Sequence, residues 1–277
     1  MGPSNKALWY IESRLRAPIT LDEVAQHAEV SRFHLSRAFG VAVGVSVTRY
    51  IRARRLSEAA KSLAGGAGNI LMVAFDAGYS SHEAFTRAFR QEFGMTPESL
   101  RDQRHLGSIE LKEAFKMDET LLTELAPPRF ADGKTLLIAG LSERYSDDTV
   151  GGIPGQWQRF GGHIGTVPNQ VGDASYGVCC NSDEAGNIDY ITGVEVSDFD
   201  GLPADWARIR IPAQRYAVFH HKEHISQIRR TWHTVFDRWL PGSGHELLDA
   251  PSFERYDNRF DPETGMGGLE IWIPLKA

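Results

Sequence analysis

The chain has 277 residues, which is long for a single domain, and its formal net charge is −6. Residues 1–107 carry 14 Lys/Arg against 10 Asp/Glu, whereas the remaining residues carry 16 against 26. A basic part joined to an acidic part favours a DNA-binding module attached to a second domain. No apolar run approaches the ~18 residues of a membrane span, and no signal peptide is evident. We therefore expect a cytoplasmic protein without a membrane partner.

The two cysteines, Cys179 and Cys180, are adjacent in the sequence. Neighbouring cysteines rarely pair with each other, and no further cysteine is available for a disulfide or a zinc site. This predicts a reducing compartment, no metal and no cofactor. The thiols are interpreted either as small buried packing residues or as redox sensors.

A near-repeat organises the first hundred residues: Leu35–Phe39 returns as Phe85–Phe89, at an offset of 50 residues. Each copy reads as a short apolar helix, a tight turn and a second helix that carries an arginine. This is the helix-turn-helix pattern, in which the second helix enters the DNA major groove. The sequence thus predicts an all-α domain over residues 1–107 with two recognition helices on one chain.

The predicted helices follow in chain order. A first helix contains Trp9 and Leu15, and a second begins after Thr20, which forms a capping box with Glu23. Ser31 caps the first recognition helix. A long amphipathic helix over 47–63 leads to the second unit, whose recognition helix is predicted to be capped by Ser80.

Residues on the side of each recognition helix that does not pack inward are the candidates for base contacts. They are Arg32, Phe33, Ser36 and Arg37 in the first helix, and Ser81, His82, Glu83, Thr86 and Arg87 in the second. Two alternatives stay open. Arg37 and Arg87 could form salt bridges that support the fold, and Glu83 could orient Arg87 instead of accepting from cytosine.

The strings 78–81, 85–90 and 93–97, together with 34–37 and 50–56, resemble the signature of the AraC/XylS transcription regulators. The resemblance covers about the first 105 residues. It implies promoter DNA and RNA polymerase as partners, activation as the outcome, and base reading by the residues named above. One segment departs from the family: residues 40–44 are uncharged where relatives usually carry lysine or glutamate, which would weaken phosphate contact there.

Residues 108–119 are interpreted as a linker, and residues 120–277 as a second domain in which strands alternate with helix. Strands are predicted at 134–141, 175–180, 188–196, 206–211, 215–220, 253–256 and 269–275, and a helix at 225–240. The strings 211–219, 239–244, 253–256 and 270–274 resemble the GyrI-like, effector-binding domain. The resemblance implies two related α/β halves with a ligand cleft between them, and hence a multidomain chain with an all-α head and an α+β tail.

Five of the six tryptophans lie in this second domain. Aromatic faces around a buried carboxylate suit a flat or cationic organic effector, and the resemblance implies a glutamate at the cleft floor. The candidate ligand-binding residues are Glu254, Glu270, Tyr216, Trp157, Trp206, Trp232, Trp272 and Tyr256. The alternative is that both glutamates pair with arginines on a solvated sheet face and that the tryptophans are ordinary core residues.

The favoured function is a one-component transcription regulator whose tail senses a small molecule, with no catalytic residues. A hydrolase that uses Glu254 or Glu270 with a tyrosine, and a module that binds a protein, remain open alternatives. His220, His221 and His224 suggest a metal site, but solvated loop histidines are the favoured interpretation. The oligomeric state, the effector and the operator are left open.

Overall fold

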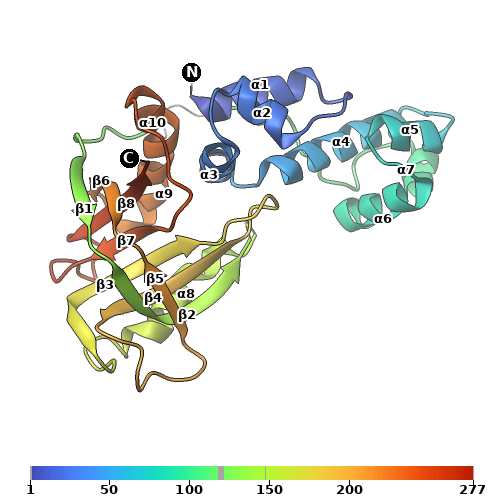
Figure 1. The fold of residues 1–277 in the computed structure, drawn as a ribbon. Helices are drawn as coiled ribbons and strands as arrows, with labels where there is room; N and C mark the ends of the chain where they lie inside the picture. Colours follow the sequence, from blue (N-terminus) through green and yellow to red (C-terminus); the bar gives the residue numbers. More distant parts are fainter. Residues whose placement is uncertain (1, 118–121, 147, 277) are drawn as a thin grey trace.

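The computed structural model describes residues 2–117, 122–146 and 148–276. The expected domain start at residue 120 and the end of the expected linker lie outside the described residues. Figure 1 shows a helical part beside a strongly twisted sheet with its own helices. No helix among the described residues has the length and apolar character that would let it cross a membrane.

The helical part contains the two expected helix-turn-helix units, α2–α3 and α5–α6, joined by the long helix α4 (Figure 1). The helices are α1 (Pro3–Ser13), α2 (Leu21–His27), α3 (Arg32–Val43), α4 (Val47–Ala64), α5 (Ile70–Asp76), α6 (His82–Phe93) and α7 (Pro97–Gln103).

Local capping explains where these helices begin. Thr20 accepts a hydrogen bond from the Glu23 amide while the Glu23 carboxylate accepts one from the Thr20 amide, which confirms the capping box. Ser31 caps α3. The prediction for α6 was wrong by one residue, because Ser81 rather than Ser80 accepts from the Ala84 amide. Ser81 therefore caps the helix, a role that competes with the predicted contact to DNA.

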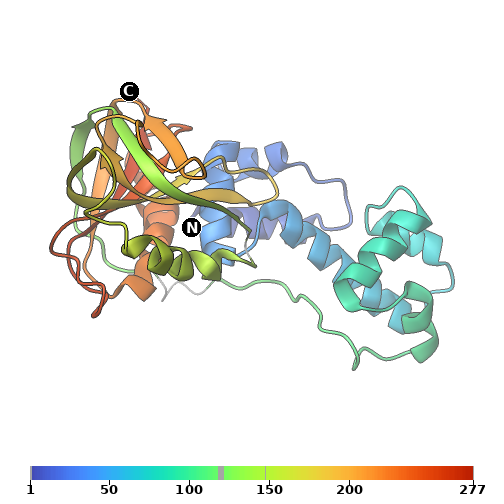
Figure 2. The same cartoon turned by 90° about the horizontal axis from the view of Figure 1, so that it is seen from below.

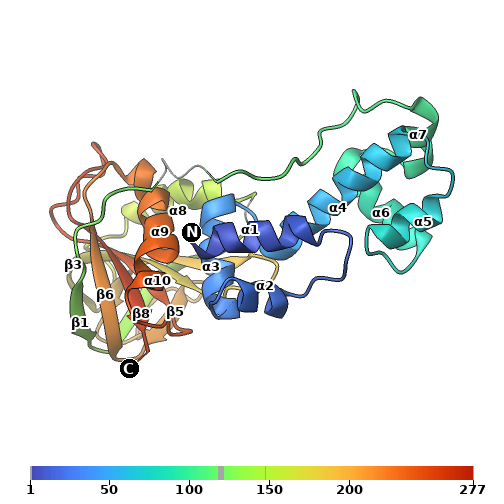
Figure 3. The ribbon, with the colours of Figure 1, turned by 90° about the horizontal axis from the view of Figure 1, so that it is seen from above.

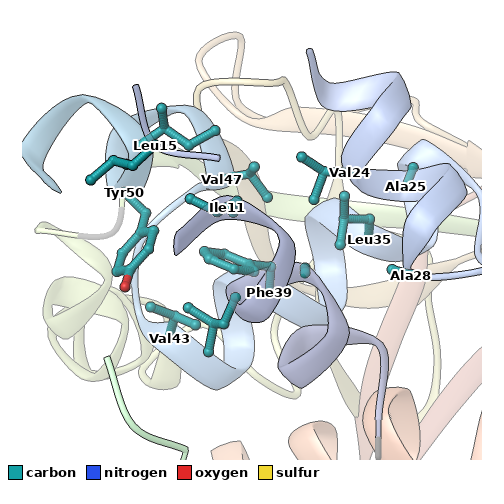
Figure 4. Packing of buried hydrophobic residues seen from close by; sticks show 13 residues of the cluster. Ile11, Leu15, Val24, Ala25, Ala28, Leu35, Phe39, Val43, Val47 and Tyr50 are labelled. Carbon is teal, nitrogen blue, oxygen red and sulfur yellow. The ribbon is translucent and has the colours of Figure 1, made fainter. Parts of the chain in front are cut away.

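Each helix-turn-helix unit has its own core. Around the first unit, Leu35, Phe39 and Val47 pack with side chains from α1 and α2 (Figure 4). Around the second, Phe85 and Phe89 pack against the C-terminal half of α4. The two recognition helices are therefore fixed to opposite ends of one continuous helix.

The segment after α7 runs back along α4 towards the second domain, as Figures 2 and 3 show. Side chains of α4 bind this segment: Ser57 accepts from the Lys112 amide at 2.9 Å, and Tyr50 accepts from the Phe115 amide at 2.9 Å. Arg54, bound by Glu12, donates to the Lys112 carbonyl at 2.8 Å. The described part of the expected linker, residues 108–117, is thus attached to α4 by hydrogen bonds.

The described strands of the second domain form one antiparallel sheet in the order β1-β6-β8-β7-β3-β4-β2-β5. The strands are β1 (Arg129–Gly133), β2 (Leu136–Tyr145), β3 (Gln170–Cys180), β4 (Ile188–Val196), β5 (Ala207–Ile211), β6 (Gln214–His221), β7 (Ser252–Tyr256) and β8 (Leu269–Leu275). The sequence predicted the other strands but missed β1, which is short and largely exposed.

The sheet consists of two equivalent halves that meet at the β3–β7 pair, which confirms the expected duplicated module. In one half β2 leads through α8 (Ile153–Gly161) to β3 and β4. In the other, β6 leads to β7 and β8 through a helical segment made of η3 (Ile225–Gln227), α9 (Ile228–Thr234), η4 (Val235–Trp239) and α10 (Leu240–Gly242). That segment was predicted at 225–240, whereas α8 was missed.

Alternation along the strands assigns side chains to two faces. On β7, Phe253 faces a cluster with Tyr176 and Trp272, while Glu254 faces the side covered by α8 and α9. Residues from both halves share the first cluster, because the curved sheet brings its two ends together. The groove between the two helices lies on the opposite face, above the β3–β7 junction.

Candidate ligand cleft and DNA-reading helices

Glu254 lies at the floor of this groove and is 7% exposed. Its carboxylate accepts hydrogen bonds from the hydroxyls of Tyr190 and Tyr256, both at 2.8 Å, and from the indole nitrogen of Trp232 at 3.1 Å. All three donors are neutral. Among the described residues, no arginine, lysine or histidine lies within ion-pair distance of this carboxylate, and His221 acts on it only through a longer-range charge effect. The site therefore holds a buried acid without a counter-ion.

Burial raises the pKa of Glu254 above its ordinary value, and the hydrogen bonds from Tyr256, Tyr190 and Trp232 offset part of this rise. The same burial, together with the charge of Glu254, raises the pKa values of Tyr190 and Tyr256 well above 10. A cation placed beside the carboxylate would relieve the desolvation penalty. The electrostatics of the floor thus favour a positively charged ligand.

The cavity above Glu254 has a volume of about 260 Å³. Tyr190 and Cys179 complete its floor, Trp232 and Ile228 of α9 form one wall, and Ile153 at the start of α8 lies on the other side. Its roof comes from the helical part of the chain. The roof residues are Ser36, Arg37, Gly40, Val41, Gly44, Ser46 and Val47.

The structure gathers part of the predicted ligand set at this cleft. Glu254 and Trp232 line the cavity. Tyr256 supports the carboxylate from below, and Trp157 packs edge-on against Tyr256 with ring centroids 4.8 Å apart. The indole nitrogen of Trp157 donates to the Tyr190 hydroxyl at 3.1 Å. These aromatic side chains connect both halves of the domain to one acid.

The prediction was wrong for Glu270, which lies on the other face of the sheet. Its carboxylate accepts two hydrogen bonds from Arg129, at 3.0 and 3.1 Å, and lies 3.6 Å from Arg255. The strand register explains the error, because Glu254 is paired with Ile271 whereas Glu270 is paired with Arg255. The alternative interpretation, an acid paired with arginine, is correct for this residue.

Three aromatic candidates also lie away from the cleft. Tyr216 and Trp272 belong to the cluster on the opposite face, in contact with Phe253. Trp206 packs against Phe160 beneath α8, with ring centroids 5.5 Å apart. These side chains fill cores, so they are not available to a ligand above Glu254.

Tyr190 is a site residue that sequence reasoning missed, and Gly177 is the residue that makes room for it. A Cβ atom on Gly177 would lie 2.1 Å from the Tyr190 hydroxyl and 2.9 Å from the Glu254 carboxylate. A glycine inside a strand is a signal for such close approach. This glycine, in the middle of the predicted strand 175–180, was available as that signal.

Among the residues that the structure describes, the histidines and cysteines form no second site. His221 is buried, donates to the His224 carbonyl at 3.1 Å and accepts from Thr231, so the expectation of a solvated side chain was wrong for it. Among the described residues, no group of His, Cys, Asp or Glu side chains could hold a metal ion. Burial raises the pKa of Cys179 to about 12 and that of Cys180 to about 11, which disfavours a reactive thiolate.

The candidate DNA-reading face of α3 is covered by the second domain. Phe33 packs in a cluster with residues of α9, η4 and β8. Arg37 donates to the Ser252 hydroxyl at 2.5 Å, and His34 donates to the Phe236 carbonyl at 2.9 Å. The expectation that this face is free to enter a groove was therefore wrong for this arrangement of the domains.

By contrast, the outer side of α6 is open to solvent in the described part of the chain. Glu83 and Arg87 are exposed, and His82 is half-buried and bound to Glu98 at 3.0 Å. The hydroxyl of Thr86 is buried without a hydrogen-bond partner among the described residues. Of the five predicted reading residues of the second helix-turn-helix unit, Glu83 and Arg87 are thus exposed to solvent, while Ser81, His82 and Thr86 are partly buried.

The chain is similar to known proteins over both parts. Residues 127–276 match the family described as GyrI-like small molecule binding domain, and residues 24–103 match a helix-turn-helix domain family. The transcriptional regulator Rob of Salmonella typhimurium is 26% identical, covering 97% of this chain and 96% of that protein. The transcriptional regulator BrlR of Pseudomonas aeruginosa is 31% identical over 46% of this chain and 47% of its own length.

The solved structure of SAV2435 bound to tetraphenylphosphonium covers 55% of this chain and 95% of that protein, at 21% identity and a TM-score of 0.46. The family match at residues 127–276 spans more than half of the chain and contains the acid, its donors and the two flanking helices. The chain therefore belongs to the GyrI-like family, with a helix-turn-helix domain joined to its N-terminal side.

Proposed function

We propose that this protein is a transcription regulator that binds promoter DNA through its two helix-turn-helix units and an aromatic organic cation through its GyrI-like cleft. The relatives Rob and BrlR, both transcriptional regulators, support the class. In this proposal Arg32, Phe33, Ser36 and Arg37 of α3, and His82, Glu83, Thr86 and Arg87 of α6, contact DNA. RNA polymerase is the proposed partner at the promoter, and activation the proposed outcome.

One observation carries the choice of ligand: the carboxylate of Glu254 is buried and bound only by neutral donors. A buried charge without a counter-ion is unfavourable, and an organic cation supplies the counter-ion and also stacks on Trp232. The cavity walls are mainly apolar, which suits the hydrocarbon part of such a molecule.

The test is calorimetric titration of the full chain with tetraphenylphosphonium. We expect wild type to bind and Glu254→Gln to lose binding by at least tenfold. Glu270→Gln is the matched control, because it neutralises an acid on the opposite face of the same sheet. Equal affinity in wild type and Glu254→Gln would refute the acidic cleft as the binding site.

A hydrolase remains the second candidate, favoured by one observation: a buried acid of raised pKa touches two tyrosine hydroxyls. An acid of this kind can act in proton transfer. Mass spectrometry of ester and amide compounds recovered after incubation separates the two functions. Recovery of the unchanged compound after incubation with wild type supports a sensor. A hydrolysis product that forms with wild type but not with Glu254→Gln would establish an enzyme.

A further inference from the structure

The side chain of Arg37 occupies the aromatic end of the ligand cleft. Its guanidinium lies 5.6 Å from the ring centroids of both Trp232 and Phe236, within the range of a cation–π contact. The indole of Trp232 is the same ring that donates to Glu254. A residue of the proposed DNA-reading set therefore occupies the place where an effector cation would stack.

The small volume of the cavity is consistent with Arg37 filling part of the cleft. About 260 Å³ remains above Glu254 while Arg37 is in place, which is slightly less than the ~300–1,000 Å³ of typical ligand pockets. Withdrawal of Arg37 would lengthen the cavity along Trp232. An aromatic cation and the Arg37 guanidinium cannot both stack on this ring at the same place.

Acidic groups of the second domain form ion pairs with arginines of α3 and α4. Glu184, on the β3–β4 hairpin that extends towards the helical part in Figure 2, forms an ion pair with Arg32, and its carbonyl accepts from the Thr48 hydroxyl at 3.0 Å. Asp148 pairs with Arg49 near the start of α4. These basic side chains lie on elements where DNA phosphates would otherwise be the partners.

The end of α3 is held as well. Arg229 donates to the Val41 carbonyl at 2.8 Å and to the Gly40 carbonyl at 3.4 Å, so a cation from α9 satisfies the C-terminal carbonyls of α3. A Cβ atom on Gly44 would lie 2.9 Å from this guanidinium. The uncharged segment 40–44 is therefore the segment that lies under α9.

We propose that Arg37 is exchanged between the effector cleft and DNA, so that the closed arrangement of the two domains keeps α3 from the major groove until a cation displaces Arg37. This inference rests on the proposed function and adds how the cleft controls DNA binding. The cation and DNA both require α3 to leave the cleft. By linkage, each increases the affinity for the other by the same factor.

The first experiment needs no ligand. We measure the affinity of the full chain for a duplex selected from a random-sequence library, using fluorescence anisotropy. Glu184→Ala combined with Arg229→Ala removes contacts that hold α3 in place, and we expect at least a tenfold gain in DNA affinity. Glu263→Ala, which removes an exposed acid between β7 and β8, controls for the loss of one acidic side chain and should change the affinity by less than twofold.

The double substitution removes one acidic and one basic side chain, so the net charge of the protein, and with it the overall attraction to DNA, is unchanged. A gain in affinity therefore reports release of α3. An affinity equal to or lower than that of wild type would overturn the proposal, whether or not a cation binds in the cleft.

The second experiment uses tetraphenylphosphonium and the repeat-related pair of arginines. We expect Arg37→Ala to bind the cation at least tenfold more tightly than wild type, because the internal competitor is gone. Arg87→Ala, the equivalent change on the exposed helix α6, should leave cation affinity unchanged. Weaker binding by Arg37→Ala would make Arg37 part of the ligand site and would overturn the exchange.

Failure of the proposed function has a different signature. If neither wild type nor Arg37→Ala binds the cation, sensing of organic cations by the Glu254 cleft is refuted. The DNA measurement on the Glu184→Ala, Arg229→Ala variant then still decides whether the closed arrangement restrains α3.

Discussion

Tyr190 and Glu254 meet across the junction of the two halves of the sheet, where the tyrosine hydroxyl donates to the carboxylate at 2.8 Å. Tyr190 lies on β4, Glu254 lies on β7, and β3 runs between them. The tyrosine side chain crosses above Gly177 of β3, which is paired in register with Glu254. The cleft floor is thus built by residues of both halves.

Tyr190→Phe should weaken cation binding and raise the pH at which binding is half-maximal. The substitution removes one of three donors to the carboxylate, and a hydrogen bond to a charged group contributes about 1.5–3 kcal/mol. We expect the pH midpoint of tetraphenylphosphonium binding to rise by about one to two pH units. Calorimetric titrations across pH measure this. Tyr216→Phe, on the opposite face, is the control and should leave the midpoint unchanged.

Cation affinity of the wild-type protein should increase with pH. Burial raises the pKa of Glu254 in the free protein, and a bound cation would lower it, so binding releases a proton. Affinity therefore falls as the pH drops through the raised pKa and levels off above it. Titrations in buffers of different ionisation enthalpy detect the released proton. Constant affinity between pH 4.5 and 8 would contradict this account.

The same shift has a consequence for stability. A carboxyl group with a raised folded-state pKa stabilises the fold fully below its unfolded-state pKa and loses that contribution as pH rises through the folded-state pKa. Chemical denaturation of wild type and Glu254→Gln should therefore diverge as pH increases from 4 to 8. Parallel pH profiles would show that the pKa of Glu254 is the same in the folded and the unfolded chain, which would contradict the raised pKa.

Gly177→Ala should damage the cleft and the fold together. The added methyl group would overlap the Tyr190 hydroxyl at 2.1 Å, and overpacking of a core typically costs about 1–3 kcal/mol. Thermal unfolding should show a lowered midpoint, and cation titration should show weaker binding. Gly161→Ala is the control, since a Cβ atom there meets nothing within 4 Å and φ at this residue is not positive.

Arg87→Ala should reduce sequence discrimination by the exposed helix α6. A good arginine–guanine contact is worth about 1–3 kcal/mol of discrimination. We expect affinity for a selected duplex to fall tenfold or more, with a smaller loss for random-sequence duplex. Arg90→Ala, on the last turn of the same helix, should lower both affinities alike. If Arg87→Ala also lowers the affinity for the selected and the random-sequence duplex by the same factor, Arg87 contacts the phosphate backbone instead of a base.

The sequence predicted the helical repeat and most strands because local signals specify them. Thr20 and Glu23 form a reciprocal cap within four residues, and the repeated Phe85 and Phe89 lie on the inward face of α6. The register of paired strands, by contrast, depends on residues far apart in the sequence. Whether Glu254 or Glu270 faces the helices depends on the pairing of β7 with β8, and both acids were equally plausible before that pairing was known.

Contacts between the domains were beyond sequence reasoning for a similar reason. The spacing of Phe33, Ser36 and Arg37 places them on one side of α3, but it does not reveal which surface covers that side. The segment 40–44 is uncharged, and the sequence does not show what lies beside it. In the structure its carbonyl groups bind Arg229, almost two hundred residues further along the chain.

Helix α4 has a consequence for the operator. It is one unbroken helix of 18 residues, Val47–Ala64, about 27 Å long at 1.5 Å per residue, with a recognition helix fixed at each end. Its length and helical phase together set the spacing and the relative orientation of the two DNA segments that the recognition helices can contact. One residue inserted near its middle would turn α6 by about 100° about the axis of α4. Selection experiments with such an insertion should then recover only one of the two half-sites.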